Sequence, residues 1–248
     1  MLDWLLAPID ALRPHEIQGA AAWHARLMIL AWGGLVPCGI LAARFLKLWP
    51  GQNWPQELDH PGWWHLHRSL HYLTGALTLI ALGLILLPGG SSGAATTHRL
   101  FGWSVVGLAA LQFASAWLRG SKGGPSEGAS DGGTHGDHYD MSPRRRAFEY
   151  IHKFGGYLAL FGACGAIGSG LWHANAPHWM WLLIGAWWLA CLVLFGWLQR
   201  RGLAFDTYQA HWGSDLVHPG NRRPPIGFGI RRHPAPSAAN ETHHHEPL

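Results

Sequence analysis

Histidines at the beginning of long apolar segments are the residues of this sequence best suited to metal and redox chemistry. The chain contains 18 histidines, and imidazole binds transition metals as well as protons near neutral pH. Five of them open such segments: His24, His67, His71, His98 and His152. The three cysteines lie inside apolar runs and form no C-x-x-C pair, which is typical of buried, unreactive thiols. Redox chemistry in this chain would therefore depend on histidine.

The apolar segments that carry these histidines are long enough to cross a bilayer, which takes about 20 residues. The sequence predicts five of them: residues 20–43, 69–87, 100–118, 154–172 and 179–198. Charged residues make up only 13% of the chain, about half of the ~25% usual in soluble proteins. Tryptophans cluster at the segment ends, as in the aromatic belts of membrane proteins. We therefore predict an all-α integral membrane protein with five transmembrane helices in contact with lipid.

The composition also excludes several classes of function. The scarcity of charge argues against a soluble enzyme, and no stripe of interleaved basic and aromatic residues supports a nucleic-acid partner. The five segments contain no Asp or Glu of the kind that ion-coupled transporters use. They also lack a central lysine that could hold retinal.

The regions outside the five segments are polar. Residues 1–19 are predicted to lie at the membrane interface, either as a short amphipathic helix or as a frayed terminus. Residues 120–142 are rich in Gly, Ser, Asp and His, which predicts a flexible loop in which His135 and His138 are solvated. Residues 201–248 are rich in Pro, Gly and Arg and are predicted to be a disordered tail.

Lysine and arginine are distributed unequally between the two sides of the predicted bundle. The side with the N-terminus and the second and fourth loops holds Arg13, Arg26 and Arg99, and the other side holds the remaining 15 of the 18. The positive-inside rule then places the N-terminus outside and the C-terminus in the cytoplasm.

Because successive segments run in opposite directions, the five histidines fall on two membrane faces. The first and third segments begin on the outer side, which brings His24 close to His98. The second and fourth begin on the inner side, which brings His152 close to His67 or His71. Two imidazoles at one depth in a helix bundle are what bis-histidine ligation of a haem iron requires. Spacing alone does not choose between His67 and His71, which lie four residues apart on one helix face.

Small residues beside the histidines favour haem. Glycine follows His98 by four residues and His152 by three and four, and the missing side chains leave room for a flat porphyrin on the same helix face. Close helix packing is the alternative explanation. Gln112 lies fourteen residues after His98 on nearly the same face, about 21 Å further along the helix. There it would either anchor the inner haem or form an interhelical hydrogen bond.

The motifs around the histidines resemble those of the cytochrome b561 domain. They are, in order, H-A-R-L-M from residue 24 with A-W-G from residue 31, L-H-R-S-L from 66, H-R-L-F-G from 98 with L-Q from 111, and H-K-F-G-G-Y from 152. These are similar to the family patterns H-G-x-L-M…A-W-G, L-H-R-x-L, H-x-x-x-G…L-Q and H-x-x-x-G-x. The resemblance covers residues 20–200. It departs from the eukaryotic pattern in having five spans rather than six.

The resemblance implies that the first four helices form a bundle around two non-covalent haem b groups. Carried over position by position, His24 and His98 would hold the outer haem and His67 and His152 the inner one. His71 would then lie beside the inner porphyrin.

Three basic residues near the inner haem extend this expectation: Arg44, Arg68 and Lys153. They would balance the haem propionates, receive an anionic reductant, or serve only as positive-inside anchors.

The leading hypothesis is an electron carrier that passes single electrons across or within a bacterial-type inner membrane, between an unidentified donor and acceptor. Two axial imidazoles leave the iron no open position, which favours outer-sphere transfer. The alternative is a non-catalytic, haem-bearing anchor subunit of a larger redox complex. A ferric reductase-like activity and a homodimer stay open.

Overall fold

The computed structural model describes residues 1–15, 19–86, 96–125, 127 and 132–235, and the regular structure in these residues is helical, with no β-strand among them. Five helices in this part of the chain are long and apolar enough to cross a membrane: Gly19–Phe45, Gly62–Leu86 (α4), Thr96–Trp117 (α5), Pro143–His173 (α6) and His178–Arg200 (α7). The first of these consists of α2 (Gly19–Met28), a π-helix η1 (Ile29–Leu35) and α3 (Val36–Phe45). The prediction of an all-α integral membrane protein with five transmembrane helices is confirmed.

Helices α4 and α6 begin earlier than predicted, because the prediction counted only apolar residues and both helices continue through polar turns. At the start of α6, Ser142 is the N-cap, and its Oγ accepts a hydrogen bond from the Arg145 backbone N–H at 3.2 Å. Pro143 occupies the first helical position, where a missing N–H costs nothing. His67 and His152 therefore lie inside regular helices, and this fixes the direction in which their side chains point.

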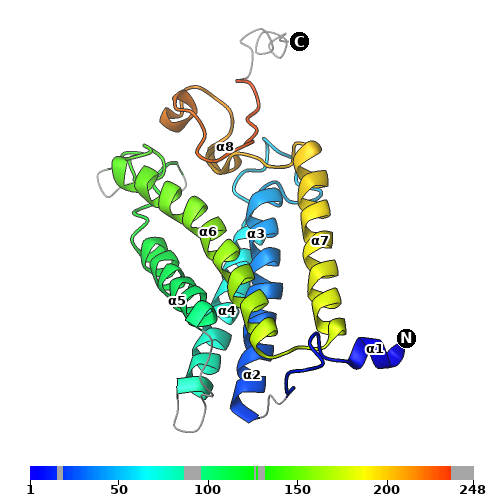
Figure 1. The fold of residues 1–248 in the computed structure, drawn as a ribbon. Helices are drawn as coiled ribbons and strands as arrows, with labels where there is room; N and C mark the ends of the chain where they lie inside the picture. The colour runs from blue at the N-terminus through cyan, green and yellow to red at the C-terminus, as the bar shows by residue number, and fades with distance from the viewer. Residues whose placement is uncertain (16–18, 87–95, 126, 128–131, 236–248) are drawn as a thin grey trace, which may run out of the picture.

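The helices pack as two antiparallel groups with α7 beside them (Figure 1). Helix α5 lies along α6, and α4 lies along α2 and α3, while η1 joins the two groups by packing against both α4 and α6. Helix α7 packs against α3, and the short helix α1 (Leu2–Leu6) lies at the start of α7. We call the end of the bundle that carries α1 the outer end, and the opposite end, covered by residues 201–235, the inner end.

The middle of the bundle is an apolar core centred on the π-helix. Ala31 and Trp32 of η1 pack against Val105 of α5 and Ala159 of α6, all of them buried. The wider turn of a π-helix leaves a carbonyl group without its usual helical partner. Here the Gly33 carbonyl accepts hydrogen bonds from two indole N–H groups of α7, those of Trp187 at 2.9 Å and Trp188 at 3.2 Å. The π-helix therefore also attaches α7 to the bundle.

At the outer end, Asn175 ties the N-terminal segment to the turn between α6 and α7. Its side chain accepts a hydrogen bond from the Asp10 backbone N–H (3.0 Å) and donates to the carbonyls of Asp10 (2.9 Å) and Arg13 (2.8 Å). His178 Nδ1 contacts the Ala7 carbonyl at 2.9 Å. The expected interfacial segment is thus held against the bundle.

At the inner end, residues 46–61, the described part of 118–142, and residues 201–235 form a small folded unit that we call the inner cap. Its core contains Tyr139, Met141, Tyr208, Trp212 and Ile226. The Tyr208 hydroxyl donates to the Tyr139 carbonyl at 2.7 Å, and both Tyr208 and Trp212 belong to a short helix, α8 (Thr207–Trp212).

The inner cap corrects the expectation of a disordered tail, which does not hold for residues 201–235; residues 236–248 lie outside the described residues. The aromatic residues that build the cap core are scattered through a Pro- and Gly-rich sequence, so they show no helical or strand period. The expectation of a solvated His138 is also wrong, since this side chain is 3% exposed and packs against Tyr208 and Trp212. His135, by contrast, is exposed.

Acidification is expected to destabilise the inner cap through two buried histidines. Burial lowers the pKa of His138 well below its usual value and also lowers that of His211, against the opposing effect of Asp59, whose carboxylate lies 3.1 Å from His211 Nε2. Below about pH 6.5 the unfolded chain therefore binds more protons than the folded one, so stability is lost as the pH falls.

This pH dependence can be measured as the thermal unfolding midpoint in detergent at about pH 7.5 and about pH 5. His138→Phe should reduce the decrease of the midpoint at acid pH, while the same substitution at the exposed His65 should not. An unchanged pH dependence in the His138 variant would contradict the assignment.

Candidate functional site

The structure brings together two pairs of histidines, one near each end of the bundle. The rings of His24 on α2 and His98 on α5 have centroids 6.3 Å apart with an interplanar angle of 83°. Those of His67 on α4 and His152 on α6 are 6.1 Å apart with an angle of 78°. A metal ion between two imidazoles, with bonds of about 2 Å, separates the ring centroids by roughly 6 Å. Both pairs therefore have the spacing of two axial ligands.

The Nδ1 atom of each of these four histidines contacts a polar group on another helix. The contacts are His24 with the Ala81 carbonyl (2.9 Å), His98 with the Ala166 carbonyl (2.9 Å), His67 with the Gly39 carbonyl (3.0 Å) and His152 with the Gln112 side-chain amide (2.8 Å). A carbonyl oxygen at Nδ1 requires a proton there, so the lone pair is on Nε2. Metal-ligating histidines in proteins are held in this way by their second nitrogen. The Nε2 atoms of His24, His67 and His98 are thus prepared for coordination, whereas the Gln112 amide nitrogen donates to His152 Nδ1.

The four histidines and the residues that contact their Nδ1 atoms recur at a nearly fixed spacing along the helices. Three intervals are 14 residues long: His67 to Ala81, His98 to Gln112 and His152 to Ala166. The interval from His24 to Gly39 is 15 residues, and it contains the π-helix Ile29–Leu35, whose wider turn accommodates an extra residue. At 1.5 Å per residue, 14 residues correspond to about 21 Å. Both histidine layers therefore fit within a bilayer core of about 30 Å.

A cavity of about 750 Å³ surrounds the inner pair. It is lined by His67, His71, His152 and Gln112, and it extends along apolar side chains as far as Trp32 in the middle of the bundle. Its volume lies in the range of roughly 300–1,000 Å³ that cofactor sites occupy. The cavity thus combines two facing imidazoles with a largely apolar lining.

His71 has a different environment from His67. Its ring centroid lies 4.3 Å from that of His67, and its Nδ1 contacts the His67 carbonyl of the same helix at 2.9 Å. A Cβ atom at Gly39 would overlap the His71 ring, so the glycine allows α3 and α4 to approach closely here. The structure therefore places His67 opposite His152 and His71 beside it, a choice that residue spacing leaves open.

Basic side chains line the inner end of this cavity: Arg44, Lys47, Arg68, Arg119, Arg145 and Lys153. Three of them donate hydrogen bonds to backbone carbonyls of the inner cap. The contacts are Arg44 with Phe228 (2.8 Å), Lys47 with Phe205 (2.8 Å) and Lys153 with Ile226 (2.9 Å). Arg68, by contrast, is exposed. The inner cap thus closes a cationic end of the cavity.

Four charged residues of this end were not predicted as site residues: Lys47, Arg119, Arg145 and Glu149. Lys47 is buried, and burial, reinforced by Lys153, lowers its pKa to about 7. Glu149 is the only acid among the described residues that line the cavity, and its carboxylate contacts Arg145 at 3.1 Å and Lys153 at 2.6 Å. The four-residue spacing of Arg145, Glu149 and Lys153 places them on one helix face and is the sequence signal that could have identified this network.

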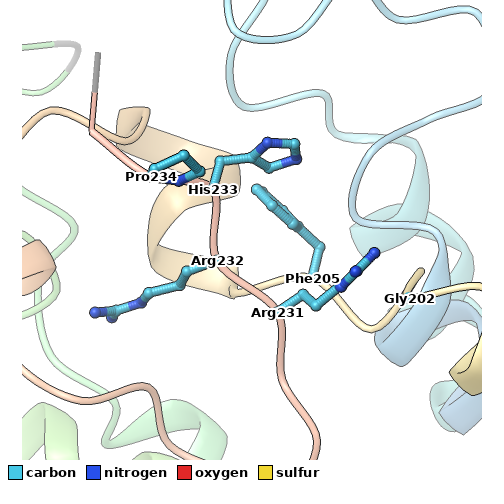
Figure 2. Close-up of a pocket in the computed structure, with 6 residues that line it drawn as sticks. All are labelled: Gly202, Phe205, Arg231, Arg232, His233 and Pro234. Carbon is cyan, nitrogen blue, oxygen red and sulfur yellow. The ribbon is translucent and has the colours of Figure 1, made fainter. Parts of the chain in front are cut away.

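A second cavity, of about 260 Å³, lies within the inner cap. Figure 2 shows that its two arginines, Arg231 and Arg232, point to opposite sides of the chain, and Arg232 forms an ion pair with Asp206. These side chains do not converge on a common ligand position. The histidine cavity is therefore the candidate functional site.

Within the described part of the chain, no group of three or more His, Cys, Asp or Glu side chains is placed to hold a metal ion. A haem requires only the two axial groups, because the porphyrin supplies the other iron ligands. The facing imidazoles and the apolar cavity with a cationic end fit a planar, apolar cofactor that carries acidic groups. The residues present therefore fit haem at the inner pair.

The chain is similar in sequence to several known proteins. The chain is 30% identical over 186 residues, 72% of its length, to a cytochrome b561, DM13 and DOMON domain-containing protein of Arabidopsis thaliana, of which the match covers 18%. It is 38% identical over 98 residues, 39% of its length, to ferric-chelate reductase 1 of Bos taurus, of which the match covers 16%. The human ferric-chelate reductase 1 is 38% identical over 90 residues, 36% of this chain and 15% of the relative.

The chain spans less than a fifth of the length of these relatives. No protein-family model matches it, and no solved structure matches it. The similarity to these curated proteins, together with the five spanning helices and the paired histidines, establishes the family. The chain belongs to the cytochrome b561 family of membrane-embedded electron-transfer proteins that bind haem b.

Proposed function

We propose that this chain holds two haem b groups, one near each end of the bundle, and passes single electrons between the two sides of the membrane. The observation that carries the proposal is the pair of ring separations, 6.3 Å for His24 and His98 and 6.1 Å for His67 and His152. When bound, each haem supplies a one-electron iron couple with both axial positions filled by imidazole. Such a site favours outer-sphere transfer over the binding of oxygen.

The residues between the two pairs would insulate the transferred electron from water. Trp32 is 7% exposed, and its indole N–H donates to the Thr78 hydroxyl at 3.0 Å. Ala31, Val105 and Ala159 complete this apolar layer. The layer would keep polar solvent away from the path between the two sites.

At the inner end, Arg44, Arg68 and Lys153 would balance the acidic groups of the inner haem or receive an anionic reductant. All three line the inner cavity, and Arg44 also donates to Gln199 at 2.8 Å and Tyr157 at 3.2 Å. These contacts hold the guanidinium in place before any ligand binds. His71, on the wall of the same cavity, would pack beside the porphyrin.

The excess of lysine and arginine at the inner end supports an orientation with the N-terminus outside and the inner cap in the cytoplasm. We assign the protein to a bacterial-type inner membrane.

The relatives named ferric-chelate reductase suggest a ferric chelate as one acceptor, which would make the chain a transmembrane oxidoreductase. The folded inner cap favours a second candidate, a haem-bearing subunit or homodimer that docks another redox protein there.

Reconstitution into sealed vesicles tests the proposal. With a ferric chelate enclosed and a membrane-impermeant reductant outside, vesicles containing the chain should reduce the enclosed iron several-fold faster than empty vesicles. His24→Ala should abolish the difference. Reduction of the haems without reduction of the enclosed iron would favour the anchor-subunit candidate, and failure to reduce any haem would contradict electron transfer.

A second prediction concerns Gly39, where helices α3 and α4 approach each other closely. A methyl group there would overlap the His71 ring, and the Gly39 carbonyl also holds His67. Gly39→Ala should therefore lower the content of inner haem, by up to one haem per chain. Gly34→Ala, on the same span with open space at its Cβ position, should not change it. Equal haem contents in the two purified variants would show that the inner site does not depend on this contact.

A further inference from the structure

Residues 226–230 of the inner cap cross the inner end of the histidine cavity, and we call this segment the strap. Gly227, Phe228 and Ile230 of the strap line the cavity, although the segment belongs to none of the spanning helices. It comes from the Pro- and Gly-rich region that follows the last span. The strap therefore forms part of the boundary between the cavity and the water beyond the inner end.

Side chains from three different helices hold the strap by its backbone carbonyls. The contacts are Lys153 of α6 with Ile226 (2.9 Å), Arg44 of α3 with Phe228 (2.8 Å) and Gln199 of α7 with Gly229 (2.7 Å). A hydrogen bond between protein groups can be exchanged for one to water at a small net cost in free energy. These three contacts can therefore open without disrupting any helix.

The side chain of Phe228 covers part of the cavity wall. Its ring centroid lies 5.6 Å from that of Tyr157, and the Arg44 guanidinium carbon lies 4.4 Å from the Phe228 ring centroid. Both Tyr157 and Arg44 line the cavity. Phe228 is nevertheless 53% exposed. The ring thus packs on cavity residues while much of its surface contacts water.

Both ends of the strap are anchored in the inner cap. Ile226 is buried in the core of the cap. Just beyond the other end, the Arg231 backbone N–H donates to the Ala204 carbonyl at 2.7 Å, and the Arg231 carbonyl accepts from the Asp206 N–H at 2.9 Å. A movement of the strap would therefore be confined to residues 227–230.

Two glycines flank Phe228 within this movable part. Gly227 has a φ of 117° and Gly229 a φ of 58°, values that glycine adopts without the strain that a Cβ atom would cause. Glycine also crosses easily between backbone conformations, so the chain can turn on both sides of Phe228. The strap thus combines fixed ends, two turning points and a bulky apolar side chain between them.

We propose that the strap is a lid over the inner site, with Phe228 as its cover. Closed, it keeps water-borne reagents away from the inner site. It opens by turning at Gly227 and Gly229 when Arg44 and Gln199 release its carbonyls, which gives a water-borne electron donor or acceptor access to the inner haem. Loops that cover a reaction site commonly control access in this way. The inference rests on the proposed function for its haem, whereas access to the cavity can be measured separately.

A single cysteine in the cavity wall measures this access in the purified full chain. Ala43 lines the cavity, and Ala43→Cys, with the three native cysteines replaced by alanine, should react slowly with a charged, water-soluble thiol reagent. Phe228→Ala removes the cover and should raise the labelling rate several-fold. Gly229→Ala should also raise it, because alanine is strained at this φ and its Cβ atom would overlap the Gln199 amide, which destabilises the closed position.

The reduction of the haems provides a second readout. In holoprotein with the native Ala43, stopped-flow absorbance after mixing with dithionite should show one haem that is reduced several-fold faster in Phe228→Ala, while the other keeps its rate. Leu216→Ala is the control for both measurements, because it removes an exposed apolar side chain of the cap outside the strap. This control should change neither rate.

The possible failures are distinguishable. Equal labelling rates in Phe228→Ala, Gly229→Ala and the chain with an unsubstituted strap would overturn the lid and leave the haem assignment intact. An equal increase in Leu216→Ala would also overturn it, since the whole cap would then be loosened. Fewer than two haems per chain, with the labelling difference present, would support the lid and contradict the proposed function.

Discussion

Replacing His98 with alanine is expected to remove about one of the two haems that we propose for each chain and to leave the other with the spectrum expected for bis-histidine ligation. His98 is the partner of His24 in the outer pair, and no other histidine ring contacts this pair in the described part of the chain. The inner pair lies about 21 Å away along the helices and has its own cavity. The corresponding inner variant, His152→Ala, should remove the other haem.

The measurement is the haem content of each purified variant by pyridine haemochrome assay, normalised to protein concentration. His173→Ala serves as the control, because this exposed histidine also lies on the outer part of α6 but belongs to neither pair. Loss of both haems from His98→Ala and from His152→Ala, with a normal control, would show that the two sites are not independent. Retention of both haems in either variant would exclude that histidine as a ligand.

Replacing Glu149 with alanine is expected to cause the largest loss of stability among substitutions outside the histidine pairs. The carboxylate is 4% exposed and lies between Arg145 and Lys153. Removing it leaves the Arg145 and Lys153 cations without their shared carboxylate partner, near a third cation, Lys47. Breaking a buried ion pair by removing one partner costs about 3–5 kcal/mol.

The free energy of unfolding in detergent micelles, with Glu57→Ala as the control, measures this effect. Glu57 is an exposed acid of the inner cap, so its removal should change stability by less than about 0.5 kcal/mol. A Glu149 variant as stable as this control would show that the network does not stabilise the inner end.

The sequence was sufficient to predict the five spans and the grouping of the histidines by membrane face, because both depend on hydropathy and on the alternating direction of the helices. The pairing of His24 with His98 follows from this alternation alone. The choice between His67 and His71 did not follow, since the two lie on one helix face and differ only in what the neighbouring helix places against them. That difference depends on Gly39, which lets α3 approach α4.

The groups that hold the histidines could not be predicted in the same way. Three of them are backbone carbonyls, at Gly39, Ala81 and Ala166, and any residue type supplies a carbonyl. Only Gln112, a polar residue at the right interval on an apolar helix, leaves a signal in the sequence. The π-helix also escaped prediction, although the 15-residue interval on the first span, against 14 on the others, is its trace.

The inner cap shows a different limit of sequence reasoning. Polar, Pro- and Gly-rich composition is typical of disorder, yet a few aromatic residues build a core when a membrane bundle supplies the surface beneath them. Phe205 and Phe228 expose their carbonyls to Lys47 and Arg44 of the bundle. The cap is therefore ordered by contacts with helix ends far away in the sequence, which local composition does not report.

We propose that four imidazoles hold two haems in this chain. The most direct test is electron paramagnetic resonance of the oxidised, unsubstituted holoprotein, with the spins counted against the protein concentration. We predict two low-spin ferric haem signals per chain, each typical of bis-histidine ligation, and no high-spin signal. A single low-spin haem per chain, or a high-spin haem that binds an added exogenous ligand, would contradict the account.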